Sequence, residues 1–174
     1  MGATCTVAGV PLEARITSLR RRHRSSVRPF FYFVLPPALL RDAWLLRKDA
    51  ADFAAVLAPK VHGTYHLDQA TRAMALDFFV LFSSVASARG NAGQSDYAAA
   101  NGFMDHYAAH RNRLVAAGER HGRTRSIHWP LWQDGGMRLD AEAQAHLKQI
   151  SGMTPLRTAS GMHAFDVSLA LNAD

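Results

Sequence analysis

The sequence has little of what membrane-spanning or disulfide-stabilised proteins require. No stretch of about 18 consecutive apolar residues occurs, so a membrane span is not expected. The single cysteine, Cys5, cannot form an internal disulfide, which suits a reducing compartment such as the cytoplasm. With 48% hydrophobic and 20% charged residues, the 174-residue chain otherwise has the composition of one globular domain.

Acidic residues are scarce in the first part of the chain. Residues 1–40 contain six Arg and one Glu, whereas residues 41–174 hold fourteen Lys and Arg against thirteen Asp and Glu. Most of the net charge of +6 therefore belongs to the N-terminal segment. A basic run of this kind can bind nucleic acid or serve as an organelle transit segment. We favour a basic segment without either role, and we expect neither a nucleic-acid nor a membrane partner.

A change of pattern near Leu40 divides the chain. Residues 1–28 show no sustained period and are predicted to be irregular, while residues 30–35 could form a short buried strand. From Asp49 onward, apolar residues recur at helical spacing. Pro59 is predicted to interrupt or restart this helix, because proline cannot donate an intrahelical hydrogen bond.

The rest of the chain alternates strands and helices. Residues 78–82 form an uninterrupted apolar run, which is typical of a strand covered on both faces of a parallel sheet. Further elements are predicted at residues 94–117 (a long alanine-rich helix stopped by Gly118), 124–129 (a strand), 140–149 and 160–171 (helices). The order helix, strand, helix, strand predicts an α/β protein built on a doubly wound, Rossmann-like parallel sheet.

Four polar side chains are expected to meet at one edge of that sheet. Tyr97 and Asn101 are four residues apart on the long helix, so their side chains share one face. Ser84 lies just past the C-terminal end of the buried strand, where open α/β sheets bind their ligands. Lys60 belongs to the preceding helix and could reach the same crevice.

Together these four groups suit the reduction of a ketone. A carbonyl that receives hydride needs a proton, which a tyrosine phenol can supply, and a nearby ammonium such as Lys60 lowers a phenol's pKa from about 10. The Ser84 hydroxyl can hold the carbonyl oxygen, and the Asn101 amide could fix the lysine or a water. None of the four supplies hydride, so a nicotinamide cofactor is required. Taken singly, each residue also suits a structural role in packing, capping or solvation.

Several motifs in a fixed order carry a family resemblance. They lie at residues 57–63 (LAPKVHG), 76–84 (LDFFVLFSS), 93–94 (GQ), 97–101 (YAAAN), Asp105, 126–132 (SIHWPLW), 135–137 (GGM), 155–156 (PL) and 161–165 (GMHAF). In these motifs the chain resembles the ketoreductase (KR) domains of modular polyketide synthases, within the short-chain dehydrogenase superfamily. It looks most like synthases whose acyltransferase acts in trans. The resemblance covers about residues 40–171 and leaves residues 1–39 aside.

The resemblance implies an oxidoreductase of secondary metabolism. Its reaction is the NADPH-dependent reduction of a β-ketoacyl thioester, held by phosphopantetheine on an acyl carrier protein, to the β-hydroxyacyl form. By this resemblance Tyr97 is the proton donor, and Lys60 and Asn101 support it. Ser84 is the carbonyl anchor in preference to Ser83, because Ser84 stands thirteen residues before Tyr97, the family's usual interval.

The resemblance also implies cofactor contacts and a product configuration. Tyr97, Lys60 and the backbone of Pro130 and Leu131 would lie against the cofactor. Leu40-Arg41-Asp42 keeps the last acid of the Leu-Asp-Asp motif that marks one stereochemical class of the family. The tryptophan of the opposite class is replaced here by Arg89, so the chain is assigned to the Leu-Asp-Asp type.

The sequence departs from the family upstream of the motifs. It contains no Gly-x-Gly-x-x-Gly to cradle cofactor phosphates, and only 59 residues precede Lys60. We therefore expect a partial sheet whose N-terminal nucleotide-binding half is missing or supplied by a partner. Residues 1–39 are interpreted as a shifted reading frame. Because half a sheet leaves an exposed edge and uncovered apolar surface, the chain alone is expected to fold poorly and bind NADPH weakly.

Three other functions fit parts of the sequence. A serine hydrolase using Ser83 or Ser84 would need the Gly-x-Ser-x-Gly turn, which is absent. The pairs His62/His66 and His106/His110 have metal-ligand spacing, but they lack the His-Glu-x-x-His pattern and an evident third ligand, so no metal is expected. A non-catalytic, reductase-like subdomain that packs against a partner chain remains open, although such pieces normally lack the four polar residues.

Overall fold

The computed structural model describes residues 3–7, 10–14, 42–135, 137 and 139–171. They fall into two compact units, of which the second begins at Trp129. The elements of the first unit are β1 (Ala3–Val7), β2 (Val10–Ala14), the 3-10 helix η2 (Leu45–Arg47), α1 (Ala50–Ala70), β3 (Phe78–Ser84), α2 (Val85–Arg89), α3 (Ser95–Ala116) and β4 (Arg123–Trp129, whose last residue enters the second unit). The second unit contains α4 (Ala141–Ser151) and α5 (Thr158–Ala170).

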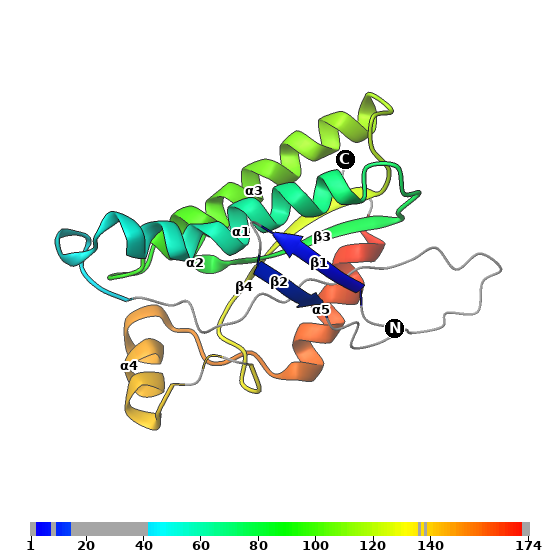
Figure 1. Ribbon diagram of the computed structural model, residues 1–174. Helices are drawn as coiled ribbons and strands as arrows, with labels where there is room; N and C mark the ends of the chain where they lie inside the picture. The colour runs from blue at the N-terminus through cyan, green and yellow to red at the C-terminus, as the bar shows by residue number, and fades with distance from the viewer. Residues whose placement is uncertain (1–2, 8–9, 15–41, 136, 138, 172–174) are drawn as a thin grey trace. The chain divides into compact units, whose positions relative to one another are not determined.

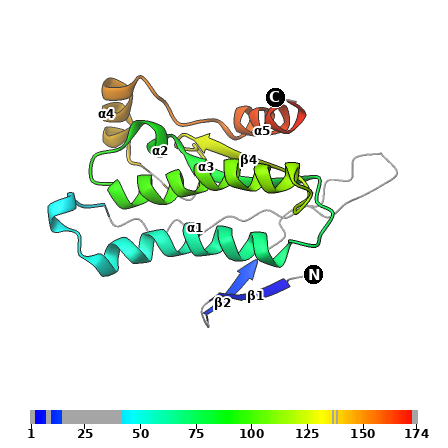
Figure 2. The ribbon, with the colours of Figure 1, turned by 90° about the horizontal axis from the view of Figure 1, so that it is seen from above.

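In the first unit, β3 and β4 form a parallel two-stranded sheet, and α3 is the helix that connects them. Figures 1 and 2 show α1 and α3 side by side and running in the same direction. The predicted α/β architecture is confirmed, and so are the strands predicted at residues 78–82 and 124–129. The long helix is confirmed too, and Gly118 follows its C-cap with a φ of 76°, a value that favours glycine.

The hydrophobic core of the first unit is formed by residues of β3 and α3 and by Leu76, which precedes β3. Leu76, Phe79, Leu81, Met104 and Ala108 form one buried cluster. The predicted strand is present, but buried residues alternate with half-buried ones along it, so one face of β3 is fully buried and the other only in part. Burial of each large apolar side chain in this cluster contributes about 1.5–3 kcal/mol to the free energy of unfolding.

The helix α1 corrects the prediction made for Pro59. It begins where Asp49 caps it by accepting a hydrogen bond from the Asp52 N–H at 2.7 Å, and it then runs without a break through Pro59. Proline removes one hydrogen bond and crowds the carbonyl of Ala55, a cost that a single helix in water would not bear easily. Packing of α1 against α3 along its length compensates for this loss, because tertiary contacts supply most of a helix's stability.

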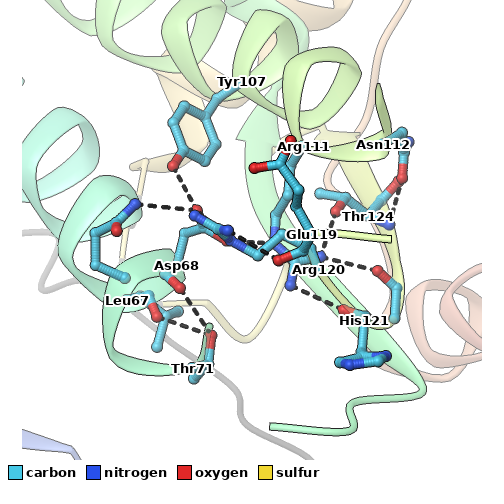
Figure 3. Close-up of polar contacts among 12 residues, drawn as sticks. Leu67, Asp68, Thr71, Tyr107, Arg111, Asn112, Glu119, Arg120, His121 and Thr124 are labelled. Carbon is cyan, nitrogen blue, oxygen red and sulfur yellow. Dashed lines mark hydrogen bonds and ion pairs between the residues drawn. The ribbon is translucent and has the colours of Figure 1, made fainter. Parts of the chain in front are cut away.

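A buried polar cluster joins the C-terminal halves of α1 and α3 (Figure 3). The Asp68 carboxylate accepts hydrogen bonds from Arg111 Nε at 2.6 Å, from Arg120 Nε at 3.0 Å and from the Tyr107 hydroxyl at 2.9 Å. The Arg111 guanidinium also lies over the Phe79 ring, 4.2 Å from its centroid. Burial alone would raise the pKa of Asp68, but these donors outweigh burial and hold it below the ordinary 3.8. No sequence motif signalled this cluster.

The N-terminal segment contains more regular structure than predicted. β1 and β2 pair antiparallel from Ala3 opposite Ala14 to Val7 opposite Val10, within residues that were predicted to be irregular. Strands of five residues are too short to show a clear period, although Thr and Val favour them. The strand predicted at residues 30–35 lies outside the described residues.

The second unit is organised around Trp132. This residue forms a parallel bridge with Leu156, and Gly161 of α5 packs so closely on its ring that an added Cβ would lie 2.3 Å away. Both predicted helices are present, and Asp140 caps α4 by accepting a hydrogen bond from the Ala143 N–H. Within the part of the chain that the structure describes, no helix combines the length and apolar character needed to cross a bilayer.

Candidate active site

Ser84 is the last residue of β3 and the N-cap of α2. Its Oγ accepts a hydrogen bond from the Ala86 N–H at 3.2 Å, and the residue is buried. A hydroxyl that accepts one bond still has a proton to donate, so Ser84 can bind a carbonyl oxygen. The Ser83 hydroxyl is turned to other partners, because it donates to the Asn101 carbonyl at 3.4 Å and helps to lower the pKa of the Asp105 carboxylate. The two serines are thus chemically distinct.

Tyr97 and Asn101 lie one turn apart near the start of α3, as predicted. The Asn101 side chain is fully buried, and its Nδ2 donates to the Tyr97 carbonyl at 2.7 Å. Its Oδ1 is buried without a hydrogen-bond partner among the described residues. A buried acceptor that lacks a partner is costly, so a ligand or water donor at this position would stabilise the site.

Lys60, in the middle of α1, extends its side chain toward Tyr97 and the end of β3. Its Nζ donates to the Phe82 carbonyl of β3 at 3.3 Å and lies 5.6 Å from the centroid of the Tyr97 ring. Burial lowers the pKa of Lys60 from 10.5 to about 8, although the Asp105 carboxylate opposes part of that change. The structure therefore brings together the predicted lysine and tyrosine and places the ammonium against the end of β3.

Asp105 is a member of this site to which the sequence assigned no role. Its carboxylate accepts a hydrogen bond from the Ser126 hydroxyl at 2.5 Å and lies 3.0 Å from His128 Nε2. Burial raises the pKa of Asp105, but hydrogen bonds from Ser126, Ser87 and Ser83 outweigh it and lower the pKa below 3.8. An ionised carboxylate therefore stands near Lys60. In the sequence, Asp105 stands four residues after Asn101, so it could have been predicted to share the helix face of Tyr97 and Asn101.

A family comparison covers the segment that carries Lys60, Ser84, Tyr97 and Asn101. The family model described as "KR domain" matches residues 11–134. The chain belongs to the KR domain family. The ketoreductase recognition drawn from the motifs is confirmed. The match begins at Pro11 and so extends upstream of Leu40, into the segment for which the motifs gave no resemblance.

Individual relatives are polyketide synthases and their ketoreductase domains. The chain is 48% identical to polyketide synthase PksN of Bacillus subtilis over 136 residues, which is 78% of this chain and 2% of that protein. It is 50% identical to polyketide synthase ThaG of Burkholderia thailandensis over 129 residues, 74% of this chain and 2% of that protein. The crystal structure of a ketoreductase domain from the bacillaene assembly line aligns with a TM-score of 0.73 at 45% identity. It matches 75% of this chain, which spans only 31% of that structure.

Pro130 and Leu131, two of the four positions predicted to contact the cofactor, belong to the second unit. The Leu131 carbonyl accepts a hydrogen bond from the Leu156 N–H at 2.7 Å. The Leu156 carbonyl in turn accepts from the Gln133 N–H at 2.9 Å. These bonds fix the backbone around Leu131, and its assignment to the cofactor stays a prediction.

The residues of the stereochemical motif are only partly described. Asp42 accepts a hydrogen bond from Gln94 Nε2 at 2.8 Å, whereas Leu40 and Arg41 lie outside the described residues. Arg89 ends α2 and is exposed. The assignment to the Leu-Asp-Asp type therefore stays a prediction.

The alternative chemistries find little support in the geometry. Within the described ranges, neither Ser83 nor Ser84 hydrogen-bonds a histidine that could act as a general base. Over the same residues, no group of three or more His, Cys, Asp or Glu is placed to hold a metal ion. His62 and His66 are exposed on α1, with ring centroids 6.5 Å apart.

Proposed function

We propose that this chain carries the catalytic residues for the NADPH-dependent reduction of a β-ketoacyl thioester to a β-hydroxyacyl thioester. The observation that carries the proposal is the Lys60 ammonium, held at the end of β3 and 5.6 Å from the Tyr97 ring centroid. Because the chain spans a few per cent of its curated polyketide-synthase relatives, the activity is proposed for the domain to which these residues belong.

In this proposal each side chain has a separate task. The Tyr97 hydroxyl gives its proton to the carbonyl oxygen of the substrate as negative charge develops there. The Ser84 hydroxyl donates a hydrogen bond to the same oxygen and orients it. The Lys60 ammonium stabilises the tyrosinate that remains, and it has three N–H donors, of which one is used by Phe82. Asn101 offers its buried Oδ1 to the lysine, a water or a ligand.

We propose a nicotinamide cofactor for this site. When bound, NADPH supplies the hydride that the carbonyl carbon requires. The unpartnered Asn101 Oδ1 and the remaining donors of Lys60 provide complementary polar groups for its nicotinamide–ribose part. We assign Tyr97, Lys60 and the backbone of Pro130 and Leu131 to that part. The sequence contains no Gly-x-Gly-x-x-Gly for the phosphates, so we propose that another segment of the synthase binds them.

The physiological partners follow from the same proposal. A β-ketoacyl chain in a polyketide synthase is carried by an acyl carrier protein, which we propose as the protein partner, with a cytoplasmic location. That the isolated chain folds poorly and binds NADPH weakly stays a prediction. A monomeric chain with a sharp cooperative melt and tight NADPH binding would contradict it.

An NADPH fluorescence titration, combined with turnover of a simple ketone, tests the proposal. We expect ketone-dependent oxidation of NADPH once the nucleotide-binding segment of a related synthase is added to the chain. Tyr97→Phe should abolish oxidation while leaving NADPH binding within about threefold, since only a proton donor is lost. Tyr65→Phe, which removes a hydroxyl from a half-exposed tyrosine on α1, is the matched control. Turnover that survives Tyr97→Phe would refute the assignment. A soluble complemented chain without turnover would favour a non-catalytic subdomain.

A further inference from the structure

We propose that the buried ion pair between Lys48 and Asp96 is a positioning pair that sets the placement of Lys60 against Tyr97. The inference rests on the proposed function, because it concerns the geometry of the residues that would transfer the proton. Neither residue is expected to touch the substrate. Both act through the helices on which the site residues stand.

The pair joins the N-terminal ends of two helices. Lys48 immediately precedes Asp49, the N-cap of α1, and Asp96 lies in the first turn of α3, next to Tyr97. Lys48 Nζ donates to Asp96 Oδ2 at 2.6 Å, and each side chain is only 2% exposed. The second oxygen of the same carboxylate, Oδ1, accepts the backbone N–H of Tyr97 at 2.8 Å. A single carboxylate thus binds the start of α1 and the backbone of the proposed proton donor.

A second polar link lies near the other end of the same helix pair. The cluster around Asp68 joins the C-terminal half of α1 to Arg111 and Tyr107 of α3 (Figure 3). Along α1, Lys60 lies between Lys48 and Asp68, and along α3, Tyr97 lies between Asp96 and Tyr107. The two helices run in the same direction (Figures 1 and 2). Sliding or rotation of α1 against α3 would separate buried opposite charges at one end or the other. Such motion is therefore opposed over the whole stretch that carries the site.

Burial explains why the pair is better understood as a geometric device than as a source of stability. Removing two charges from water costs about as much as their attraction returns, so buried pairs are often replaceable by neutral residues without net loss of stability. A neutral pair of side chains does not need to keep one particular distance between the starts of α1 and α3, as the charged pair does. Because misplacement of reacting groups by about 1 Å can cost about a hundredfold in rate, the loss should appear in kcat.

The test compares three variants of the chain, complemented as in the turnover assay. The neutral double variant Lys48→Met/Asp96→Asn keeps an acceptor for the Tyr97 N–H but removes both charges. We expect it to fold and to lower kcat about tenfold or more, with KM changed less than about threefold. The single variant Lys48→Arg keeps the positive charge and should retain most of the wild-type kcat. Asp52→Asn, an acid-to-amide change in the first turn of α1, should leave kcat unchanged.

A second readout does not depend on turnover. The pKa of Lys60, near 8 in the wild-type chain, can be measured from the pH dependence of its acylation by mass spectrometry. If the pair holds α1 against α3, the double variant should admit water to Lys60 and raise its pKa toward 10.5, whereas Lys48→Arg should not.

The two proposals fail in different ways. An unchanged Lys60 pKa and an unchanged kcat in the double variant would overturn the positioning role while leaving the ketoreductase proposal intact. A wild-type chain that never oxidises NADPH would overturn the function, and the Lys60 pKa would still decide whether the pair positions the helix. A double variant that does not fold would show that the pair is needed for stability. That outcome would also overturn the positioning role as stated.

Discussion

The Lys60 ammonium lies 5.6 Å from the centroid of the Tyr97 ring, although 37 residues separate the two in the chain. Lys60 stands on α1 and Tyr97 near the start of α3, and the parallel packing of these helices brings them together. The same ammonium donates to the Phe82 carbonyl at the end of β3. A charged group is thus held between two helices and a strand, and its protonation state becomes sensitive to its surroundings.

The first prediction concerns Lys60 itself. Because its pKa is lowered in the fold to about 8, the folded chain releases this proton before the unfolded chain does. The contribution of Lys60 to the free energy of unfolding therefore rises with pH between about 8 and 10.5, and below pH 8 the buried charge destabilises the fold. We expect Lys60→Met to abolish turnover yet to stabilise α1 at pH 7, by about 3 kcal/mol at most. Amide hydrogen exchange of α1 measures this, and reduced protection in the variant would contradict the prediction.

A second prediction follows from the charge on Asp105. This carboxylate raises the pKa of Lys60, so Asp105→Asn should lower it further below its wild-type value near 8. The acylation profile of Lys60 against pH would report the change directly. Glu119→Gln is a suitable control, because that exposed acid does not contribute to the pKa of Lys60. A Lys60 pKa that rises in Asp105→Asn would mean that the carboxylate acts mainly by excluding water.

The polar cluster around Asp68 gives a third prediction. Asp68→Asn leaves the fully buried Arg111 guanidinium without its counter-charge, which should cost about 3–5 kcal/mol. Tyr107→Phe removes one hydrogen bond to the same carboxylate and should cost about 1–3 kcal/mol. Hydrogen exchange of the facing segments of α1 and α3 would rank the two variants. Equal protection in both would show that the charge of Asp68 is not needed to hold the cluster together.

The pKa of Asp68 also predicts an acid dependence. Its folded-state value is held below 3.8, so the stabilisation is present above that pH and is lost as pH falls further. We expect wild-type protection of α1 and α3 to decline on acidification below about pH 4, and the decline to be smaller in Asp68→Asn. Parallel acid profiles for the two proteins would assign the loss to other carboxylates.

Two glycines provide a matched stability test. Gly118 and Gly122 both have φ near 77°, at 76° and 78°, but only Gly122 faces a close neighbour. A Cβ at Gly122 would lie 2.8 Å from the Leu76 Cβ and 2.9 Å from its carbonyl oxygen, whereas one at Gly118 meets nothing within 4 Å. Gly118→Ala should cost about 1–2 kcal/mol for the left-handed backbone. Gly122→Ala should cost about 1–3 kcal/mol more, because Leu76 of the core must move. Similar protection of β3 amides in both variants would argue against the close approach.

Several helices and strands could be predicted from the sequence, because their formation depends on local residue patterns. The uninterrupted apolar run at 78–82 predicted the strand β3, and the alanine-rich stretch up to Gly118 predicted α3 to within a residue at each end. Pro59 was misjudged for a physical reason. Its cost is local, but the packing of α1 on α3 that offsets this cost is not. The short strands β1 and β2 were missed because five residues carry too little periodicity.

The sequence by itself determined the family, the α/β class and the residue types that suit ketone reduction, because motif order and hydrophobic periodicity are properties of the chain. Tertiary structure alone decided how those residues meet. It set the approach of Lys60 to Tyr97, the partners that distinguish Ser84 from Ser83, and the buried pair between Lys48 and Asp96. These contacts join residues that are far apart in the chain or whose bonds depend on the packing around them. They depend on how two helices pack across a strand, which no local pattern records.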